Sequence, residues 1–183
     1  MICLRDVTEA DSARLLGWRN MPEVARYMYS DHTIGQAEHD AWFEGMMADP
    51  ARQYWIIESD GRAVGMACLY PVEKAAGPET HWAFYIAEPS ERGKGIGAAV
   101  EFLVLRHVFE ELGLERLHCE VFAFNEAVIR LHRKVGFRDT AHIENHSRKN
   151  GEWQAVVALA FDAADWPAAR VRLEPLARRA GAL

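Results

Sequence analysis

Apolar residues recur along this chain with two different periods, and the period in each segment predicts its secondary structure. Alternating or β-rich segments predict strands at Ile2–Val7, Gln53–Glu58, Arg62–Val72, His81–Ala87, Arg116–Phe122, Phe137–Asn145 and Trp153–Phe161. Helical spacing and capping residues predict helices from Thr8 onward and over Pro22–Met28, Gly35–Ala48, Gly97–Leu112, Asn125–Gly136 and Ala163–Ala180.

Two short turns indicate how the strands pair. Asp60-Gly61 and Lys149-Asn150-Gly151 each separate two predicted strands, and such turns join antiparallel neighbours. Between these hairpins, strand, glycine-rich turn, helix and strand follow one another, which is typical of a parallel connection. We therefore predict a mixed α/β fold, a partly antiparallel and partly parallel sheet of about seven strands flanked by helices. The main domain is expected over residues 1–162, with a C-terminal helix and tail over residues 163–183.

The composition is typical of a folded domain. Half of the 183 residues are hydrophobic, 26% are charged, and the formal net charge is −6. A chain of this size buries about 70% of the surface that its unfolded form exposes, which is enough for a core without metal or disulfide support. The acidic balance disfavours nucleic acid or an anionic membrane as a partner.

Neither a targeting segment nor a metal site is expected. The longest apolar stretch, Ala98–Val108, is interrupted by charged residues from Glu101 onward, which argues against a membrane-spanning helix. The three cysteines are too few for a disulfide framework and too far apart for a zinc site: Cys3, Cys68 and Cys119. We therefore expect a cytoplasmic protein without a metal, and a homodimer is left open.

The segment Arg92–Gly97 lies between a predicted strand and a predicted helix. Its three glycines free successive backbone N–H groups to point into one concavity at a helix N-terminus, which suits a phosphate. The spacing differs from the dinucleotide-binding G-x-G-x-x-G and lacks the Lys-Ser/Thr ending of a Walker loop. It predicts an anion-binding turn, and a plain glycine-rich connection is the alternative.

Two motifs together resemble the Gcn5-related N-acetyltransferases, the GNAT family. Arg92, Gly95 and Gly97 match the family's pyrophosphate loop, Arg/Gln-x-x-Gly-x-Gly/Ala. Asn125 then opens a helix that ends Leu-His-Arg-Lys-Val-Gly-Phe, where the family usually has Leu-Tyr-x-Lys-x-Gly-Phe, so His132 stands in the place of the usual tyrosine. The resemblance covers most of the chain and implies a single GNAT domain.

The resemblance implies acetyl-CoA as co-substrate. Its pyrophosphate would lie on the N–H groups of the loop, helped by the helix dipole and by two basic side chains: Arg92, Gly93, Lys94, Gly95, Ile96 and Gly97. The pantetheine arm would run between the strand of Tyr85 and Ile86 and the strand of Cys119, with Asn125 completing the cofactor site. The acceptor amine would attack the thioester directly, and a backbone N–H would stabilise the developing oxyanion.

A closer likeness within the family is to the nucleotide-sugar N-acetyltransferases of pseudaminic acid biosynthesis. It is carried by Trp18-Arg19-Asn20, Tyr27–Ser30, the helix face from His39 to Trp42, and Leu117–Val121. It implies a UDP-linked 4-amino-dideoxy sugar as acceptor, recognised by Arg19, Met28, Tyr29, His39, Trp42 and His81. The helical spacing of Met28 and Trp42 is more often that of core residues, and Arg19 could equally be a surface cation.

Glu120 and His132 are the candidate catalytic residues. An amine must lose its proton before it attacks, and Glu120 is the candidate base, acting through water. Burial beside Phe122 is expected to tune this carboxylate for the task. The resemblance places His132 at the position of the general acid, two helical turns from Asn125 on the same face. A solvent-facing strand glutamate and a surface histidine are the alternatives.

Two other functions fit the same motifs. An acetyltransferase of protein N-termini, of the ribosomal-protein type, would need a peptide groove in place of a base pocket. A non-catalytic acyl-CoA-binding module would keep the loop and show no turnover. Binding of UDP and release of thiol from acetyl-CoA distinguish the three.

Overall fold

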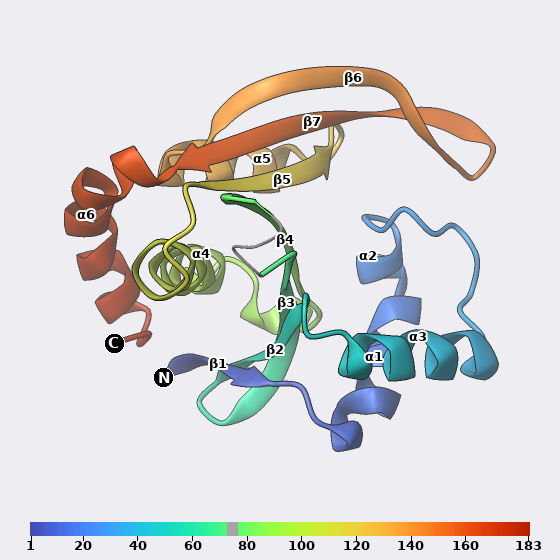
Figure 1. The fold of residues 1–183 in the computed structure, drawn as a ribbon. Helices are drawn as coiled ribbons and strands as arrows, with labels where there is room; N and C mark the ends of the chain where they lie inside the picture. Colours follow the sequence, from blue (N-terminus) through green and yellow to red (C-terminus); the bar gives the residue numbers. More distant parts are fainter. Residues whose placement is uncertain (73–76) are drawn as a thin grey trace.

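A computed structural model describes residues 1–72 and 77–183 and contains one seven-stranded sheet (Figure 1). The strand order is β1-β2-β3-β4-β5-β7-β6. The strands are β1 (Ile2–Asp6), β2 (Gln53–Ser59), β3 (Arg62–Tyr70), β4 (Glu79–Ile86), β5 (Arg116–Phe122), β6 (Arg138–Lys149) and β7 (Glu152–Asp162). The predicted mixed α/β architecture and the number of strands are confirmed.

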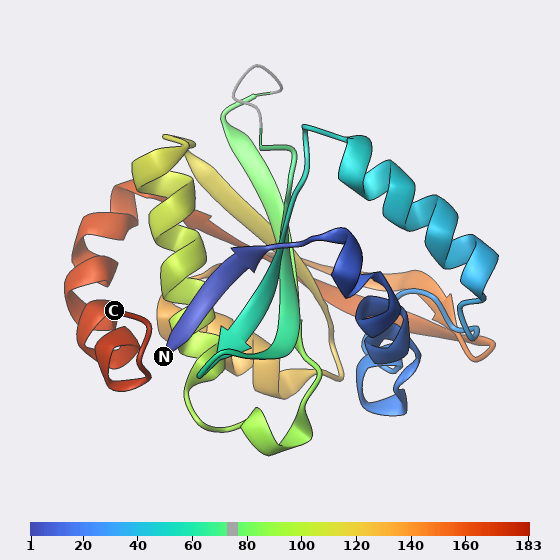
Figure 2. The same ribbon diagram turned by 90° about the horizontal axis from the view of Figure 1, so that it is seen from below.

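Helices cover both faces of the sheet (Figure 2). One face is covered by α1 (Ser12–Asn20), α2 (Pro22–Ala25) and α3 (Gln36–Ala48), and the other by α4 (Ile96–Arg106), α5 (Glu126–Val135) and α6 (Trp166–Arg179). We call the first the acceptor face and the second the cofactor face. Each face has its own hydrophobic cluster, around Trp18, Ile56 and Tyr85 on the acceptor face and around Trp82 and Phe102 on the cofactor face. No helix of the described residues is long and apolar enough to cross a membrane.

The first hairpin forms where the turn residues predict it. Asp60 and Gly61 have φ of 51° and 74°, the left-handed conformation that a tight two-residue turn requires at both positions. The turn sets the antiparallel register of β2 and β3, from Ser59↔Arg62 to Gln53↔Leu69. Strand β1 extends the sheet on the other side of β2.

The parallel strands β4 and β5 pair only over a short length. Their ladder runs from Glu79↔Arg116 to His81↔His118, whereas β4 continues to Ile86 and β5 to Phe122. Over these last residues, β4 still pairs with β3 and β5 with β7. The two strands therefore diverge after His81, and we call the space between them the notch.

Three elements differ from the sequence-based prediction. Asn20 does not cap α2; its amide instead exchanges two hydrogen bonds with the backbone of Ile34, and Met21 precedes the helix. The helix predicted to end at Leu112 changes to a π-helical turn after Arg106. Strands β6 and β7 extend past their predicted ends because cross-strand pairing, rather than alternating polarity, holds the exposed end of this hairpin.

Candidate active site

The glycine-rich turn forms an exposed loop that leads from β4 into α4. Gly93 and Gly95 have φ of 80° and 85°, which favours glycine over any residue with a side chain. Gly95 is the N-cap of α4, and the first turn of a helix has N–H groups without partners inside the helix. The loop therefore presents backbone donors and a positive helix end, the geometry expected of a pyrophosphate site.

Two further loop residues are fixed by packing. Ile96 is 3% exposed, so it contributes its backbone rather than its side chain to the loop surface. A Cβ atom on Gly97 would lie 2.8 Å from Cδ2 of Leu131. Glycine at this position therefore allows α4 and α5 to approach each other closely.

The two basic side chains of the loop have different partners. Arg92 donates to the backbone oxygen of Ile86 at 2.9 and 3.1 Å and to that of Glu23 at 3.4 Å, which ties the loop to β4 and α2. Lys94 Nζ lies 3.3 Å from the buried carboxylate of Glu91 and remains 58% exposed. Both side chains therefore bring positive charge to the loop, Arg92 as a cation held by neutral oxygens and Lys94 as an exposed cation beside the Glu91 carboxylate.

Tyr85 and Ile86 lie on the part of β4 that has diverged from β5. The Tyr85 ring is buried toward the acceptor face, in edge-to-face contact with Trp18 at 6.3 Å between centroids. Burial raises the pKa of Tyr85, so the phenol stays neutral. The β4–β5 ladder ends at His81, and the edge of β4 beyond it is where the pantetheine arm is expected. Asn125 is the N-cap of α5 beyond β5, and its amide makes no capping hydrogen bond.

His132 lies on the cofactor face, where the two strands part. Its ring is 6.2 Å from that of Phe84 on β4, centroid to centroid, and it interacts with the Cys119 side chain on β5. Only 2% of the residue is exposed. The alternative of a solvent-exposed surface histidine is therefore wrong, and the general-acid role remains a prediction.

Glu120 lies on the acceptor face of β5 and accepts a hydrogen bond of 2.8 Å from the hydroxyl of Tyr29. The predicted burial of Glu120 is wrong, because its side chain is 38% exposed. The Tyr29 ring packs on buried Phe122 at 5.1 Å but is itself half-exposed, so it cannot shield the carboxylate from water. His146 of β6, which the sequence analysis missed, lies 3.6 Å from the same carboxylate.

His81 lies at the foot of the notch on the acceptor face. Its ring lies between those of Tyr70 and His118, at 5.8 and 5.0 Å between centroids. Partial burial lowers the pKa of His81, and the neighbouring His118 adds to this effect. A neutral His81 therefore stands next to the expected position of the thioester.

Arg19, Met28 and Tyr29 come together beside the notch. Arg19 donates a 3.2 Å hydrogen bond to the Ser30 hydroxyl, while its Nε is buried without a partner among the described residues. Met28 is half-buried against the cluster of the acceptor face. Arg19 is thus not a freely solvated surface cation.

His39 and Trp42 lie elsewhere, on α3. His39 is 2% exposed, packs against Phe43 and shares a 3.0 Å hydrogen bond with Ser12, so it is a core residue and not a nucleotide contact. Helical spacing placed it on the buried side of α3. Trp42 instead lines a hollow of about 310 Å³ together with Arg52 and Tyr54.

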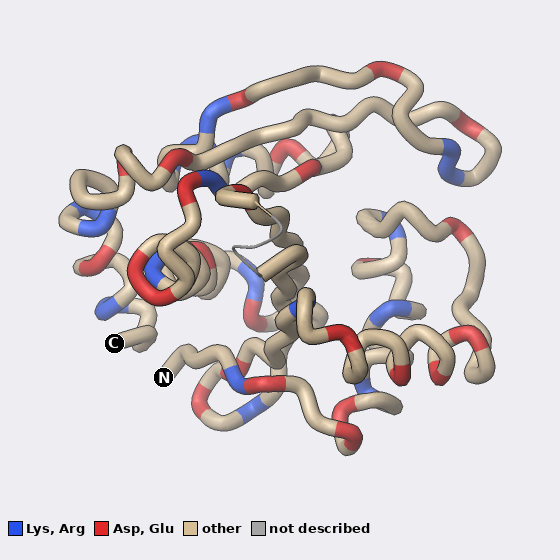
Figure 3. Tube along the Cα trace, viewed as in Figure 1, with Lys and Arg blue, Asp and Glu red and all other residues tan. Residues whose placement is uncertain are grey.

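Lys149 is a functional candidate that the sequence analysis missed. Its Nζ donates to the backbone oxygens of Ala25, Met28 and Ser30 at 2.7 to 3.0 Å. The residue is 8% exposed. The tip of the β6–β7 hairpin, whose basic residues are blue in Figure 3, is thereby fastened to the chain after α2 that carries Tyr29. No local sequence pattern predicts this contact, because Lys149 lies 119 to 124 positions along the chain from the residues whose backbone oxygens it binds.

Replacing Lys149 by methionine is expected to lower the free energy of unfolding by about 2–4 kcal/mol, because three backbone oxygens lose a charged donor. Thermal denaturation measures this loss as a fall in Tm of about 4–16 °C. Arg148→Met is the matched control, since Arg148 only covers the exposed Trp153 ring. Equal Tm values for the two variants would contradict a fastening role of Lys149.

Comparisons with known proteins agree with this geometry. The sequence model described as "Acetyltransferase (GNAT) domain" matches residues 1–138. The chain is 33% identical over 118 residues to the SPbeta prophage-derived uncharacterized N-acetyltransferase YokL of Bacillus subtilis, a match that spans 63% of this chain and 64% of YokL. It is 24% identical over 140 residues to the acetyltransferase PseH of Campylobacter jejuni, covering 75% of this chain and 85% of PseH.

A solved structure has the same fold. The spermidine N-acetyltransferase from Vibrio cholerae, in complex with CoA and spermine, superposes with a TM-score of 0.83 over 91% of this chain and 98% of that chain, at 18% identity. The family match confirms the predicted class of enzyme, an N-acetyltransferase, and the predicted co-substrate, acetyl-CoA. Because the family model extends from residue 1 to residue 138 of 183, the chain belongs to the GNAT acetyltransferase family.

Proposed function

We propose that this protein transfers the acetyl group of acetyl-CoA to the 4-amino group of a UDP-linked amino-dideoxy sugar, of the kind used in pseudaminic acid biosynthesis. The observation that carries the proposal is Arg19, whose buried Nε has no partner in the described part of the chain. Buried donors without a partner are uncommon in folded proteins. The residue as a whole is only half-buried, and its guanidinium pairs with no carboxylate among the described residues, so a diphosphate bound at its terminal nitrogens would supply the missing anion.

The surroundings of Arg19 favour an anionic acceptor. The charges of Arg19 and Lys149 lie close enough to interact, and three backbone oxygens already surround the Lys149 ammonium. Of these two cations, Arg19 is therefore the one left for a ligand. Half-exposed Tyr29 and the hollow beside Trp42 offer ring surfaces on which a base can stack.

At the notch, the candidate base lies on the acceptor face of the sheet and the candidate acid lies on the cofactor face. On the acceptor face, Glu120 takes a proton from the attacking amine through water, and Tyr29 orients the carboxylate. On the cofactor face, His132 gives a proton to the departing thiolate. Burial and the Glu120 carboxylate raise the pKa of Tyr29, so this phenol stays a hydrogen-bond donor throughout the cycle.

UDP is expected to raise the Tm of the protein by about 5 °C or more at about a hundred times its Kd, since a ligand of the folded state stabilises it. Arg19→Ala should lose most of this shift because the diphosphate loses its partner. Arg14→Ala is the matched control, since Arg14 lies on the same helix and pairs with Asp11.

Thiol release from acetyl-CoA with a panel of amines identifies the acceptor. UDP-4-amino sugars should be turned over, and spermidine and N-terminal peptides should not. No shift with millimolar UDP, together with turnover of spermidine or of a peptide, would overturn the proposed acceptor while leaving the acetyltransferase class intact.

A further inference from the structure

A fully buried carboxylate faces His132 from α4. Glu101 is 0% exposed, and its Oε1 lies 3.1 Å from Nδ1 of His132. Neither carboxylate oxygen has a well-aligned hydrogen bond from any described residue, so His132 is the polar group next to it. The geometry is that of an ion pair in contact rather than of an ideal hydrogen bond.

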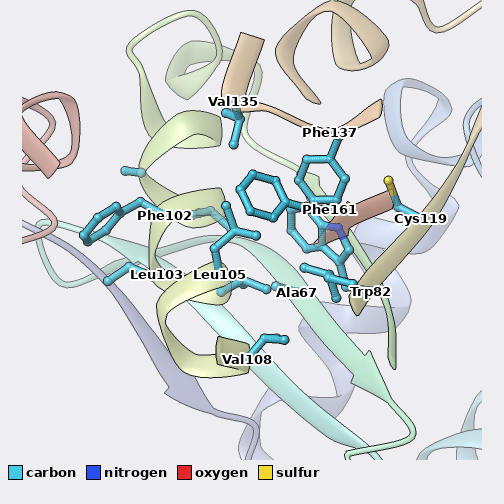
Figure 4. Packing of buried hydrophobic residues seen from close by; sticks show 14 of the residues in the cluster. Ala67, Trp82, Phe102, Leu103, Leu105, Val108, Cys119, Val135, Phe137 and Phe161 are labelled. Atoms are coloured by element: carbon cyan, nitrogen blue, oxygen red, sulfur yellow. The ribbon is translucent and has the colours of Figure 1, made fainter. Parts of the chain in front are cut away.

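Apolar rings surround the pair. The His132 ring lies 5.5 Å from that of Trp82 and 5.1 Å from that of Phe137, centroid to centroid. Figure 4 shows Trp82, Phe137 and the sulfur of Cys119 gathered at this place. Among the described residues, the titratable groups that act on His132 are Glu101 and Cys119. The pair therefore sits in a low-dielectric environment, at the side of the notch where the cofactor's sulfur is expected.

A buried ion pair such as Glu101–His132 adds little to the stability of the folded protein. Removing two charges from water costs several kcal/mol, and well-packed apolar residues in place of a buried ion pair are often as stable or more so. The packing of the core therefore gives no reason for this arrangement. Its position beside the notch points to chemistry instead.

The pair retains a proton through neutral pH. Burial raises the pKa of Glu101. For His132, burial works in the opposite direction, but the Glu101 carboxylate and Cys119 together raise its pKa to about 10. The imidazole therefore carries the proton through neutral pH, beside the Glu101 carboxylate, and can release it from its other ring nitrogen.

We propose that Glu101 is a positioning residue: it holds Nδ1 of His132 so that the other ring nitrogen stays protonated and faces the sulfur of the departing CoA. The proposal rests on the proposed role of His132 as proton donor. The amine nitrogen forms the C–N bond, the C–S bond breaks, and its electron pair leaves on sulfur. The proton of His132 moves to that sulfur to give the free thiol, the amine proton goes to Glu120, and solvent restores both groups.

The pH dependence of Glu101→Gln tests this role. Glutamine keeps the size of the side chain and removes its charge, so burial is left to lower the pKa of His132 below its ordinary value of about 6.5. The ratio of wild-type to variant kcat should rise with pH and be at least about tenfold larger at pH 8 than at pH 6, since only the variant loses the proton of His132 over this range. Taking the ratio cancels the titration of the amine, which is common to both enzymes.

Two controls separate positioning from a general loss of structure. Glu111→Gln alters a second His–Glu pair, between Glu111 and His107 at 2.7 Å, and should leave the profile unchanged. In a His132→Tyr background, which restores the usual family residue, Glu101→Gln should no longer produce a ratio that rises with pH. A rise that persists in this background would overturn the proposal.

The protonation of His132 can also be followed directly by ¹⁵N NMR of the imidazole in the wild type, without any acceptor. We expect a cationic ring at pH 8 in the wild type and a neutral ring in Glu101→Gln. A neutral His132 in the wild type at pH 7, or a flat kcat ratio, would overturn the proposal. Because the wild-type NMR measurement needs neither the variant nor UDP, it stays decisive even if the variant fails to fold or the acceptor is a different amine.

Discussion

Replacing Glu120 by glutamine is expected to lower the rate of acetyl transfer near neutral pH by about 10²–10⁴-fold. Glutamine keeps the length of the side chain and can still accept the hydrogen bond from Tyr29, so the site retains its shape. It cannot take a proton from the amine. The loss should shrink as the pH approaches the pKa of the acceptor, because free amine then forms without a base.

Steady-state kinetics between pH 6 and 9 measure this effect. Glu144→Gln is a suitable control, because Glu144 pairs with His142 and is 73% exposed. Tyr29→Phe, which removes the hydrogen bond but leaves the carboxylate, should cost much less than Glu120→Gln. Wild-type turnover of Glu120→Gln over the whole range would refute the assignment of the base, and a solvent-facing glutamate would be the better description.

The parts of the site that the sequence predicts well are those encoded by neighbouring residues. A left-handed turn favours glycine and an N-cap position favours asparagine, and both preferences are read from single positions, as at Gly95 and Asn125. The alternation of β5 likewise places Cys119 and Glu120 on opposite faces of the sheet. These local rules are enough to separate the side of the notch that holds the candidate acid from the side that holds the candidate base.

The sequence did not predict the contacts between distant segments, and it did not predict which charged side chains are buried. Lys149 meets the chain after α2 only because a long hairpin extends over it, and Glu101 meets His132 only because α4 and α5 pack closely at Gly97. A signal for Glu101 does exist in the sequence, since it is a charge within the apolar stretch Ala98–Val108. A periodic pattern shows that such a residue faces inward, but it does not reveal the partner that compensates its burial.

For His39 the error is the reverse: a ligand contact was predicted at a residue that the structure buries. Its place beside Trp42 on a helix suggested a ligand contact, whereas the same helical spacing turns it toward Ser12 and the core of the acceptor face. Arg19 was equally ambiguous in the sequence. What distinguishes the two residues is hydrogen bonding, because Nε2 of His39 pairs with Ser12 and Nε of Arg19 has no partner among the described residues.

Replacing Gly95 by valine should weaken the binding of acetyl-CoA by about 10–100-fold or more, which corresponds to the loss of one or two charge-assisted hydrogen bonds. Gly95 has a φ of 85° at the N-cap of α4, and a β-branched residue is strained there whatever space surrounds it. Steric overlap is not the cause, since a Cβ atom would meet only Ala180, at 3.7 Å. To relieve the strain the loop must rotate, and its N–H groups then no longer converge on one anion.

Titration calorimetry with acetyl-CoA measures the loss, and circular dichroism shows whether the variant is folded. Gly61→Val is the matched control: Gly61 has a similar φ of 74° in the turn between β2 and β3, also with open space around a Cβ atom. It should cost similar stability, about 1–3 kcal/mol, yet leave the affinity for acetyl-CoA unchanged. A folded Gly95→Val protein that binds acetyl-CoA as tightly as the wild type would remove this loop from the cofactor site, and the basic side chain of Lys94 would lose its proposed partner with it.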